Sequence, residues 1–447
     1  MNRSSLKLGG HANALTALRQ RLEQKLDSLL DTTTEFPASI SINEVELNVW
    51  DWLNTNRQLA RFAWSDRNSS EVWAGVGVSA KIEVPQEGDV SRSVAKCREL
   101  LNGNQELVFF GGISFDGMGD WEAFGQGKFV VPRIQFSKGK LTLAVMSEED
   151  VPRARRELQQ VRFDSEPLKS TLPSPVAKHY VPNADGWQTR IDEALALIRS
   201  EAVEKIVLSR KTILEFSESL NPIALTARLK ESTHDCFVFC FNIGEGNAFI
   251  GATPERLFLR RKDLLESEVV AGTRMRGATS EEDERLANEL LNSDKDQREH
   301  DIVRISIRQK LHKYVDHLIV DNQASLLRLA RKQHLRSNVE GKLKPGVDDG
   351  TLLKRLHPTP AVGGYPTDNA LPEIARIEPF NRGWYAAPIG WIGSDSAQFA
   401  VAIRSGLVED NKLSLFSGAG IVRGSEPEEE WQEVENKIQD FISVLGR

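Results

Sequence analysis

The chain has 447 residues, of which 40% are apolar and nine are tryptophan, so it can form two or three ordinary domains or one large unit with a sizeable core. Its net charge of -7 and isoelectric point near 5.8 argue against broad electrostatic binding to nucleic acid or to an anionic membrane surface. Any anionic ligand must therefore be held by local cations.

The cysteines and the N-terminus indicate a cytosolic protein. Cys97, Cys236 and Cys240 cannot all pair, and the last two lie in the apolar run CFVFCFNI, where a free cysteine is expected to be a small buried side chain. The first residues, MNRSSLKLGG, lack the apolar core of a signal peptide, and no run approaches the roughly 20 residues of a membrane span. We expect a cytoplasmic protein without a membrane or nucleic-acid partner.

The first part of the chain carries no motif with obvious chemistry. Residues 11–30 show the periodicity of an amphipathic helix, and residues 71–84 and 140–147 have the pattern of strands. Residues 164–186 contain four prolines and no apolar period, so they predict a connection without regular structure.

The second part of the chain alternates short strands with a few helices. Helices are predicted at 187–202, 221–231, 281–315 and 426–445, and strands at 205–210, 236–243, 247–252, 256–261, 265–272, 325–333, 384–393, 398–406 and 412–418. Because many strands follow one another across short turns, we predict an α+β protein with large antiparallel sheets flanked by helices.

The last helix is unusually acidic, with six glutamates between residues 426 and 435. At about 100° per residue, one face collects four charged side chains within roughly 60°, next to an apolar stripe. That face holds Glu426, Glu430, Glu433 and Lys437, and the stripe holds Trp431, Val434, Ile438 and Phe441. Glu428, Glu429 and Glu435 point elsewhere and are predicted to be solvated.

A second acidic face lies in DKDQREHDIV, where Asp296 and Glu299 are three residues apart and therefore adjacent on a helix. Two such faces brought together would repel one another unless a cation lay between them. Carboxylate oxygens without a cysteine or histidine cluster suit a hard ion such as Mg2+. The alternative is that the acidic residues only favour the helix start through its dipole, and the spacing alone does not decide between these.

Nine blocks of sequence, in the same order over some 235 residues, resemble the chorismate-utilising enzymes, which include the anthranilate, aminodeoxychorismate, salicylate and isochorismate synthases. The blocks are VEKIVLSRK (203–211), FIGATPERLF (249–258), VVAGTRMRG (269–277), DKDQREHDIV (294–303), KQHLRS (332–337), LHPTPAVGG (356–364), EPFNRGWYAAPIGWI (378–392), VAIRS (401–405) and SGAGIVRGSEPEEEWQEVENK (417–437). The N-terminal part matches the family more loosely.

Within the family, LHPTPAVGG and GAGIVRGSEPEEEW are most similar to isochorismate synthases of the menaquinone pathway. The resemblance implies a single large unit of two antiparallel sheets flanked by helices, in which residues 1–175 complete the fold and residues 176–447 bind chorismate. It also implies Mg2+ as cofactor, chorismate as substrate, and a monomer or homodimer without a glutamine amidotransferase subunit.

The resemblance further assigns binding residues. Glu299 and Glu433 correspond to Mg2+ ligands, and Asp296 and Glu430 to residues that reach the ion through water. Because chorismate is a dianion, Arg404 is expected to hold one carboxylate through a two-pronged contact. Further donors to the substrate are expected from Thr273, Tyr385, Lys437 and the backbone amides of Gly418, Ala419 and Gly420.

Two further positions imply the chemistry. Lys205 corresponds to the base that activates water for attack at ring C2, and Glu255 to the acid that protonates the leaving C4 hydroxyl, with His334 near that hydroxyl. Lys205 would have to be partly neutral and Glu255 would need a raised pKa. Ala271 stands where aminodeoxychorismate synthases often carry a nucleophilic lysine. The alternatives are a salicylate synthase, an isochorismate synthase of a siderophore pathway, an amine-adding member of the family and a non-catalytic chorismate-binding relative.

Overall fold

The computed structural model describes residues 8–446 except 33–34, 68, 87, 118–120, 165, 169–170, 245 and 330–331. Its strands form two large sheets, and all their pairings are antiparallel in this described part. The prediction of an α+β protein with large antiparallel sheets is confirmed.

The first sheet has 12 strands. Its spatial order is β1 (Ala38–Ile42), β8 (Lys140–Val145), β7 (Ile134–Ser137), β3 (Trp73–Val76), β2 (Arg61–Ser65), β11 (Phe237–Gly244), β12 (Asn247–Thr253), β21 (Ser405–Glu409), β22 (Lys412–Ile421), β10 (Lys205–Glu215) and β18 (Gly364–Tyr365), and β9 (Ala177–Val181) also pairs with β10.

The second sheet has 10 strands. Its order is β15 (Val315–Val320), β17 (Lys332–Leu343), β14 (Leu264–Met275), β13 (Arg256–Arg261), β20 (Ser396–Val401), β19 (Pro388–Ile392), β5 (Phe109–Ile113), β6 (Gly127–Val131) and β4 (Ala80–Glu83), with β16 (Ser325–Arg328) paired to β17. Because β2 pairs with β11 and β5 with β19, both sheets combine strands from before and after residue 175.

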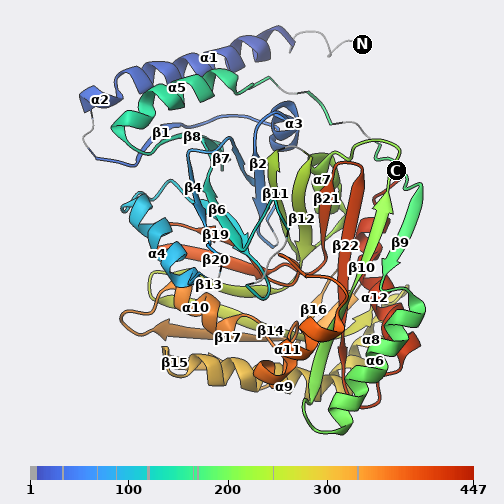
Figure 1. Ribbon diagram of the computed structural model, residues 1–447. Helices are drawn as coiled ribbons and strands as arrows, with labels where there is room; N and C mark the ends of the chain where they lie inside the picture. The colour runs from blue at the N-terminus through green and yellow to red at the C-terminus, as the bar shows by residue number, and fades with distance from the viewer. Residues whose placement is uncertain are drawn as a thin grey trace.

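Helices cover the outer faces of the sheets (Figure 1). In chain order they are α1 (Leu8–Asp27), α2 (Leu29–Thr32), α3 (Val49–Thr55), α4 (Val90–Leu101), the 3-10 turn Glu148–Asp150, α5 (Val151–Gln160), α6 (Ala184–Arg199), α7 (Pro222–Ser232), α8 (Ser280–Leu291), α9 (Asp294–Leu311), α10 (Asp349–Leu356), α11 (Thr367–Ile377) and α12 (Pro427–Ile442). Among the described helices, none has the length and apolarity needed to cross a membrane.

The two sheets pack against each other through aromatic side chains. Phe241 lies 5.0 Å from Phe62 and 5.2 Å from Trp384 between ring centroids, and Phe110 and Phe124 join the same cluster. A second core lies under α1, α3, α5 and α7, and a third between α6, α11 and the strands β10 and β22. All three cysteines are free and buried, as predicted for Cys236 and Cys240.

The helices that bear the two acidic faces form for local reasons. Pro427 at the first turn of α12 fits a helix start, and the three glutamates that follow it favour the positive end of the helix dipole. Ser293 precedes α9, and its hydroxyl accepts a hydrogen bond from the Asp296 amide at 3.3 Å, which caps the helix.

Several sequence expectations are wrong in detail. The strand expected at 398–406 covers parts of two strands in different sheets, β20 and β21, with Arg404 in the turn between them. The predicted helix at 281–315 is two helices, α8 and α9, separated at Asn292 and Ser293 because Ser293 starts a new helix. The proline-rich connection contains strand β9, which pairs with β10. The strand expected at 325–333 ends at Arg328, and β17 begins at Lys332; residues 330 and 331 lie outside the described part.

Candidate active site

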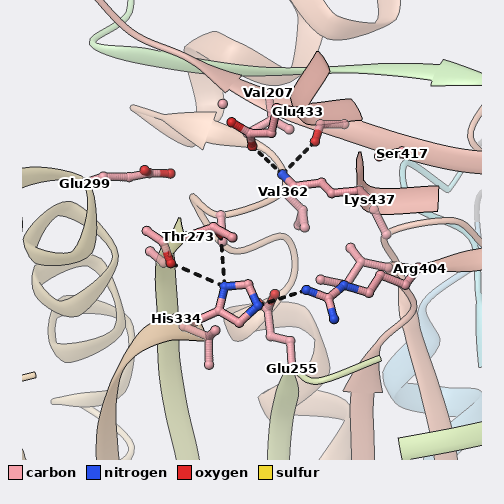
Figure 2. Close-up of a pocket in the computed structure, with 18 of the residues that line it drawn as sticks. Val207, Glu255, Thr273, Glu299, His334, Val362, Arg404, Ser417, Glu433 and Lys437 are labelled. Atoms are coloured by element: carbon pink, nitrogen blue, oxygen red, sulfur yellow. Dashed lines mark hydrogen bonds and ion pairs between the residues drawn. The ribbon is translucent and has the colours of Figure 1, made fainter. Parts of the chain in front are cut away.

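A cavity of about 360 Å³ is lined by residues of both sheets and of α9 and α12 (Figure 2). Most of the residues predicted from the sequence line it: Glu255, Thr273, Asp296, Glu299, His334, Tyr385, Arg404, Gly418, Gly420, Glu430, Glu433 and Lys437. These come from blocks spread over more than 180 residues, so the fold gathers them into one place.

Lys205 and Ala419 do not line the cavity. Ala419 is fully buried on the opposite side of β22, in the core shared with α6. Lys205, the first residue of β10, has a 1% exposed side chain and donates to Glu299 Oε1 at 2.7 Å. A Cβ on Gly420 would lie 2.8 Å from Lys205 Cε, so the glycine lets the β22 backbone lie close over this ion pair.

Each of the two acidic faces has one carboxylate paired with a lysine. Glu299 on α9 pairs with Lys205, and Glu433 on α12 accepts from Lys437 at 2.6 Å, one helical turn away. Burial alone would raise the pKa of Glu299, but the attraction and hydrogen bond of Lys205 outweigh it and lower that pKa. Burial opposes the charge of Lys437, yet Glu433 raises its pKa overall. Glu299 therefore stays ionised in this cavity, and Lys437 remains a charged partner for Glu433.

The two acidic residues expected beside these differ from each other. Asp296 is buried and accepts hydrogen bonds from both arms of Arg274, at 2.8 and 3.4 Å, so Arg274 compensates its negative charge. Glu430 is also buried, and its pKa is raised by burial and by the charge of Glu433. The sequence did not indicate Arg274, although it lies in the block VVAGTRMRG and lines the cavity.

His334 lies between Thr273 and Arg404 (Figure 2). Arg404 Nη2 lies 2.8 Å from His334 Nε2, and a guanidinium can only donate, so Nε2 is the acceptor. The proton therefore lies on Nδ1, which faces Thr273 Oγ1 at 3.0 Å and the Gly272 carbonyl at 3.3 Å. Burial and the neighbouring Arg404 lower the pKa of His334 well below its usual value, so the ring is neutral.

Arg404 is held in the turn between β20 and β21 with a backbone φ of 49°, in the left-handed region that non-glycine residues seldom occupy. It is 8% exposed, and its Nη1 lies 3.9 Å from Asp440 Oδ2. Neighbours on both sides fix the guanidinium, which points into the cavity and can receive an anion.

Glu255 lies in the turn between β12 and β13 and is 6% exposed. Burial and the nearby charge of Glu268 raise its pKa to about 8, against the opposing effect of Lys205. At neutral pH it is a protonated acid inside the cavity, which is the state that a proton donor requires.

Tyr385 and Lys437 meet at the backbone of Gly418. A Cβ on Gly418 would lie 3.1 Å from the Tyr385 hydroxyl oxygen, and Lys437 Nζ donates to the Gly418 carbonyl at 2.9 Å. Tyr385 stacks on Phe416 with ring centroids 5.3 Å apart, and burial raises its pKa, so it remains a neutral hydrogen-bond donor.

Arg382 is a second residue that the sequence argument missed. It is 2% exposed, binds both oxygens of Glu378 at 2.8 and 2.6 Å, and donates to the carbonyls of Val362 and Val207 at 2.8 Å. Glu378 also accepts from the Ser209 amide at 2.7 Å. This network ties the loop before β18 to β10 along one wall of the cavity. The sequence signal that could have identified Arg382 was its place in the block EPFNRGWY.

The expectation that Glu435 is solvated is wrong. Its carboxylate pairs with Arg210, which is fully buried, and with Lys178 at 3.0 Å. The Arg210 guanidinium lies 3.8 Å from the ring centroid of Trp431. Glu435 therefore anchors α12 to β10. The helical spacing could not predict this contact, because β10 is distant from α12 in sequence.

A metal ion in this cavity would need more than protein ligands. Among the described residues, no group of three or more histidine, cysteine, aspartate or glutamate side chains is arranged to hold a metal. Glu299 and Glu433 line the cavity, and each commits Oε1 to a lysine, which leaves Oε2 of each for a cation. Such a pair fits Mg2+, which is usually bound by one or two carboxylates together with water and substrate oxygens.

The family profile described as "Chorismate binding enzyme" matches residues 22–446. Isochorismate synthase 2, chloroplastic, from Arabidopsis thaliana is 36% identical over 408 residues, which are 85% of this chain and 71% of the plant chain. Isochorismate synthase MenF from Escherichia coli (strain K12) is 31% identical over 445 residues, which are 95% of this chain and 99% of the relative.

Solved structures agree in fold. The structure of MenF, the menaquinone-specific isochorismate synthase from Escherichia coli, matches with a TM-score of 0.83 and 31% identity, covering 95% of this chain and 100% of that one. Anthranilate synthase component I from Streptococcus pneumoniae TIGR4 matches with a TM-score of 0.66 at 20% identity, covering 92% of this chain and 93% of that one. The latter likeness concerns the fold alone.

Proposed function

Because the chain belongs to the chorismate-binding enzyme family, we propose that it is an isochorismate synthase, which adds water at C2 of chorismate and releases the C4 hydroxyl. The observation that carries the proposal is the protonated Glu255 in the same cavity as Glu299, the carboxylate that holds Lys205. An acid in the cavity, together with a lysine held behind a carboxylate of the cavity wall, suits a reaction that breaks one C–O bond while it makes another.

Glu255 is the proton donor in this mechanism. It gives its proton to the C4 hydroxyl, which leaves as water, while the ring double bonds shift by one position. Its pKa of about 8 keeps the proton available at neutral pH, and its buried position limits exchange with solvent. General acids of this kind typically contribute about 10²- to 10⁴-fold in rate.

Lys205 is the proposed base. It accepts a proton from the attacking water only as a neutral amine, whereas in the structure its ammonium donates to Glu299 at 2.7 Å. We therefore place the transfer of this lysine proton to solvent water, and the exchange of Glu299 for the attacking water as the partner of Lys205, before the attack at C2. Ala271 offers no nucleophile, which favours water over a covalent lysine adduct.

Substrate charge is met by side chains that the fold already holds in place. The Arg404 guanidinium takes one carboxylate, and Lys437, Tyr385 and Thr273 donate to the remaining oxygens. Bound Mg2+ would offset the charge of the ring carboxylate, and Glu299 and Glu433 are the residues that would hold it, with Asp296 and Glu430 acting through water.

The finer assignments belong to the same proposal. We assign the product to the menaquinone pathway because MenF aligns along nearly the whole chain. Residues 176–447 carry the chorismate-binding part and residues 1–175 complete the fold. The backbone amides of Gly418, Ala419 and Gly420 are further donors, and no amidotransferase subunit is needed. A cytoplasmic location remains a prediction, since the plant relative is chloroplastic.

The test is product analysis. Purified protein is incubated with chorismate and Mg2+, and isochorismate, salicylate and pyruvate are separated by chromatography. We expect isochorismate without pyruvate. Salicylate with pyruvate would replace the assignment with salicylate synthase, and no product would contradict enzymatic function.

A matched pair of variants tests the base. Lys205→Ala should remain folded and bind chorismate but lose hydration at C2. Lys211→Ala, on the same strand and partly exposed, should retain activity. Wild-type turnover in Lys205→Ala would refute the role of this lysine.

A further inference from the structure

A buried ion pair lies directly behind the residue that we propose as the general acid. Arg67 follows β2 in the N-terminal part, and Glu268 lies in β14 of the second sheet. Their side chains are 9% and 3% exposed, and Arg67 Nη2 lies 2.7 Å from Glu268 Oε2. The Arg67 guanidinium also stacks over the Phe237 ring at 4.9 Å, which fixes its plane.

The pair holds the backbone on both sides of Glu255. Arg67 Nη1 donates to the carbonyl of Pro254 at 3.0 Å, and the amide of Arg256 donates to Glu268 Oε1 at 2.7 Å. The two members of one ion pair therefore form hydrogen bonds to the backbone of the residues before and after Glu255. Both arms of the arginine and both oxygens of the carboxylate are used.

We propose that Arg67 and Glu268 are positioning residues that fix the Glu255 turn, so that the N-terminal part of the chain takes part in catalysis through this contact. The inference rests on the proposed function, since it assumes that Glu255 donates the proton. A displacement of about 1 Å at such a group can cost on the order of 10²-fold in rate.

Electrostatics give Glu268 a second effect on the same residue. Its negative charge opposes ionisation of Glu255, while Lys205, Lys437 and the hydroxyl of Thr359 favour it. Arg404 and the neutral His334 line the same cavity. Removing the charge at position 268 should therefore lower the pKa of Glu255, and the protonated acid should be lost at a lower pH.

The test must distinguish a positioning role of Glu268 from a contribution to stability alone. Glu268 lines a charged cavity of about 470 Å³ together with Glu266, which lies on the same strand two residues away. Glu266 contacts the guanidinium of Arg256 at 3.3 Å instead of its amide, and its side chain is 40% exposed. Glu266→Gln is thus a matched control, because it removes the same charge from the same strand and cavity without removing a hydrogen bond to the backbone on either side of Glu255.

Two variants test the pair. Glu268→Gln replaces one of the two acceptor oxygens with an NH2 donor, so either Arg67 or the Arg256 amide faces a donor in place of its acceptor. Arg67→Lys keeps the positive charge beside Glu268. It lacks the forked guanidinium that donates to the Pro254 carbonyl and to Glu268 at the same time. Isochorismate formation is measured from pH 6 to 10, with kcat and KM resolved, and chorismate binding and thermal unfolding are recorded for each protein.

We expect kcat to fall about 10- to 100-fold in both variants, with KM changed less than threefold. In Glu268→Gln the alkaline limb of the profile should move to lower pH by roughly one unit. Glu266→Gln should behave as the wild type. Wild-type kcat and pH profile in both variants, or equal losses in Glu266→Gln, would overturn the inference. A wild-type protein that makes no isochorismate would instead count against the proposed function.

Discussion

Substitution of Glu255 by glutamine separates proton donation from the other contributions of the cavity. Glutamine has nearly the same shape and is as neutral as the protonated acid, but its amide hydrogens are not acidic, so it cannot transfer a proton to the leaving hydroxyl. The structure raises the pKa of Glu255 from 4.5 to about 8, a difference worth roughly 5 kcal/mol. At pH 7 about ten molecules in eleven would hold the proton, whereas an unperturbed glutamate would hold it in fewer than about one in a hundred.

We therefore expect Glu255→Gln to bind chorismate as the wild type does and to lose about 10²- to 10⁴-fold in kcat. The wild-type rate should fall as pH rises through about 8, because the acid ionises there. Binding is measured by calorimetry and turnover by chromatography of isochorismate. Turnover within threefold of the wild type, or a wild-type rate that stays constant up to pH 10, would refute the reasoning.

Other predictions concern stability and binding. A carboxyl whose pKa is raised by folding contributes stability that is present at low pH and is lost as pH rises through the pKa of the folded state. Glu255→Gln should therefore melt at a higher temperature than the wild type above pH 8, and at a similar temperature below pH 5. A difference in melting temperature that stays the same between pH 5 and pH 8 would contradict this prediction. Arg404→Lys should weaken chorismate binding about 10- to 100-fold, a loss of roughly 1.5–3 kcal/mol, because the forked contact is lost; titration calorimetry that gives wild-type affinity would oppose this. Arg382→Met should lower the free energy of unfolding in urea by about 3–5 kcal/mol because it strands the buried Glu378, whereas Arg376→Met, whose side chain is 55% exposed, should cost less than about 1 kcal/mol.

Local patterns predicted the elements well where one face is apolar. The last helix was expected at 426–445 and runs from Pro427 to Ile442, and Glu433 and Lys437 lie one turn apart as the helical spacing requires. Its apolar stripe is also correct at Val434, Ile438 and Phe441, which are buried, whereas Trp431 is partly buried. These features depend only on neighbours in sequence, which periodicity describes directly.

The breaks in regular structure were harder to predict. Ser293, followed three residues later by Asp296, is the capping pattern that starts a new helix and was the signal for dividing the stretch 281–315. Strand β9 has no apolar alternation and is partly exposed, and it exists because β10 offers an open edge beside it. No local pattern contains that information.

The pairing of charges was the least predictable feature of the site. The contact between Lys205 and Glu299 joins residues 94 apart, and that between Arg210 and Glu435 joins residues 225 apart. The family resemblance placed Lys205 and Glu299 in one site, but spacing alone could not show that the lysine starts as the partner of the carboxylate. Only the register of β10 with β22 and the position of α9 establish it.

The central claim is that water is the nucleophile at C2 and that the C4 hydroxyl leaves. Conversion of chorismate in water labelled with a heavy oxygen isotope, followed by mass spectrometry of isolated isochorismate, tests it most directly. The account predicts one labelled oxygen, located in the new hydroxyl at C2. Unlabelled isochorismate, formed at the full rate, would mean that the original hydroxyl migrates within the substrate and would contradict the assigned roles of Lys205 and Glu255.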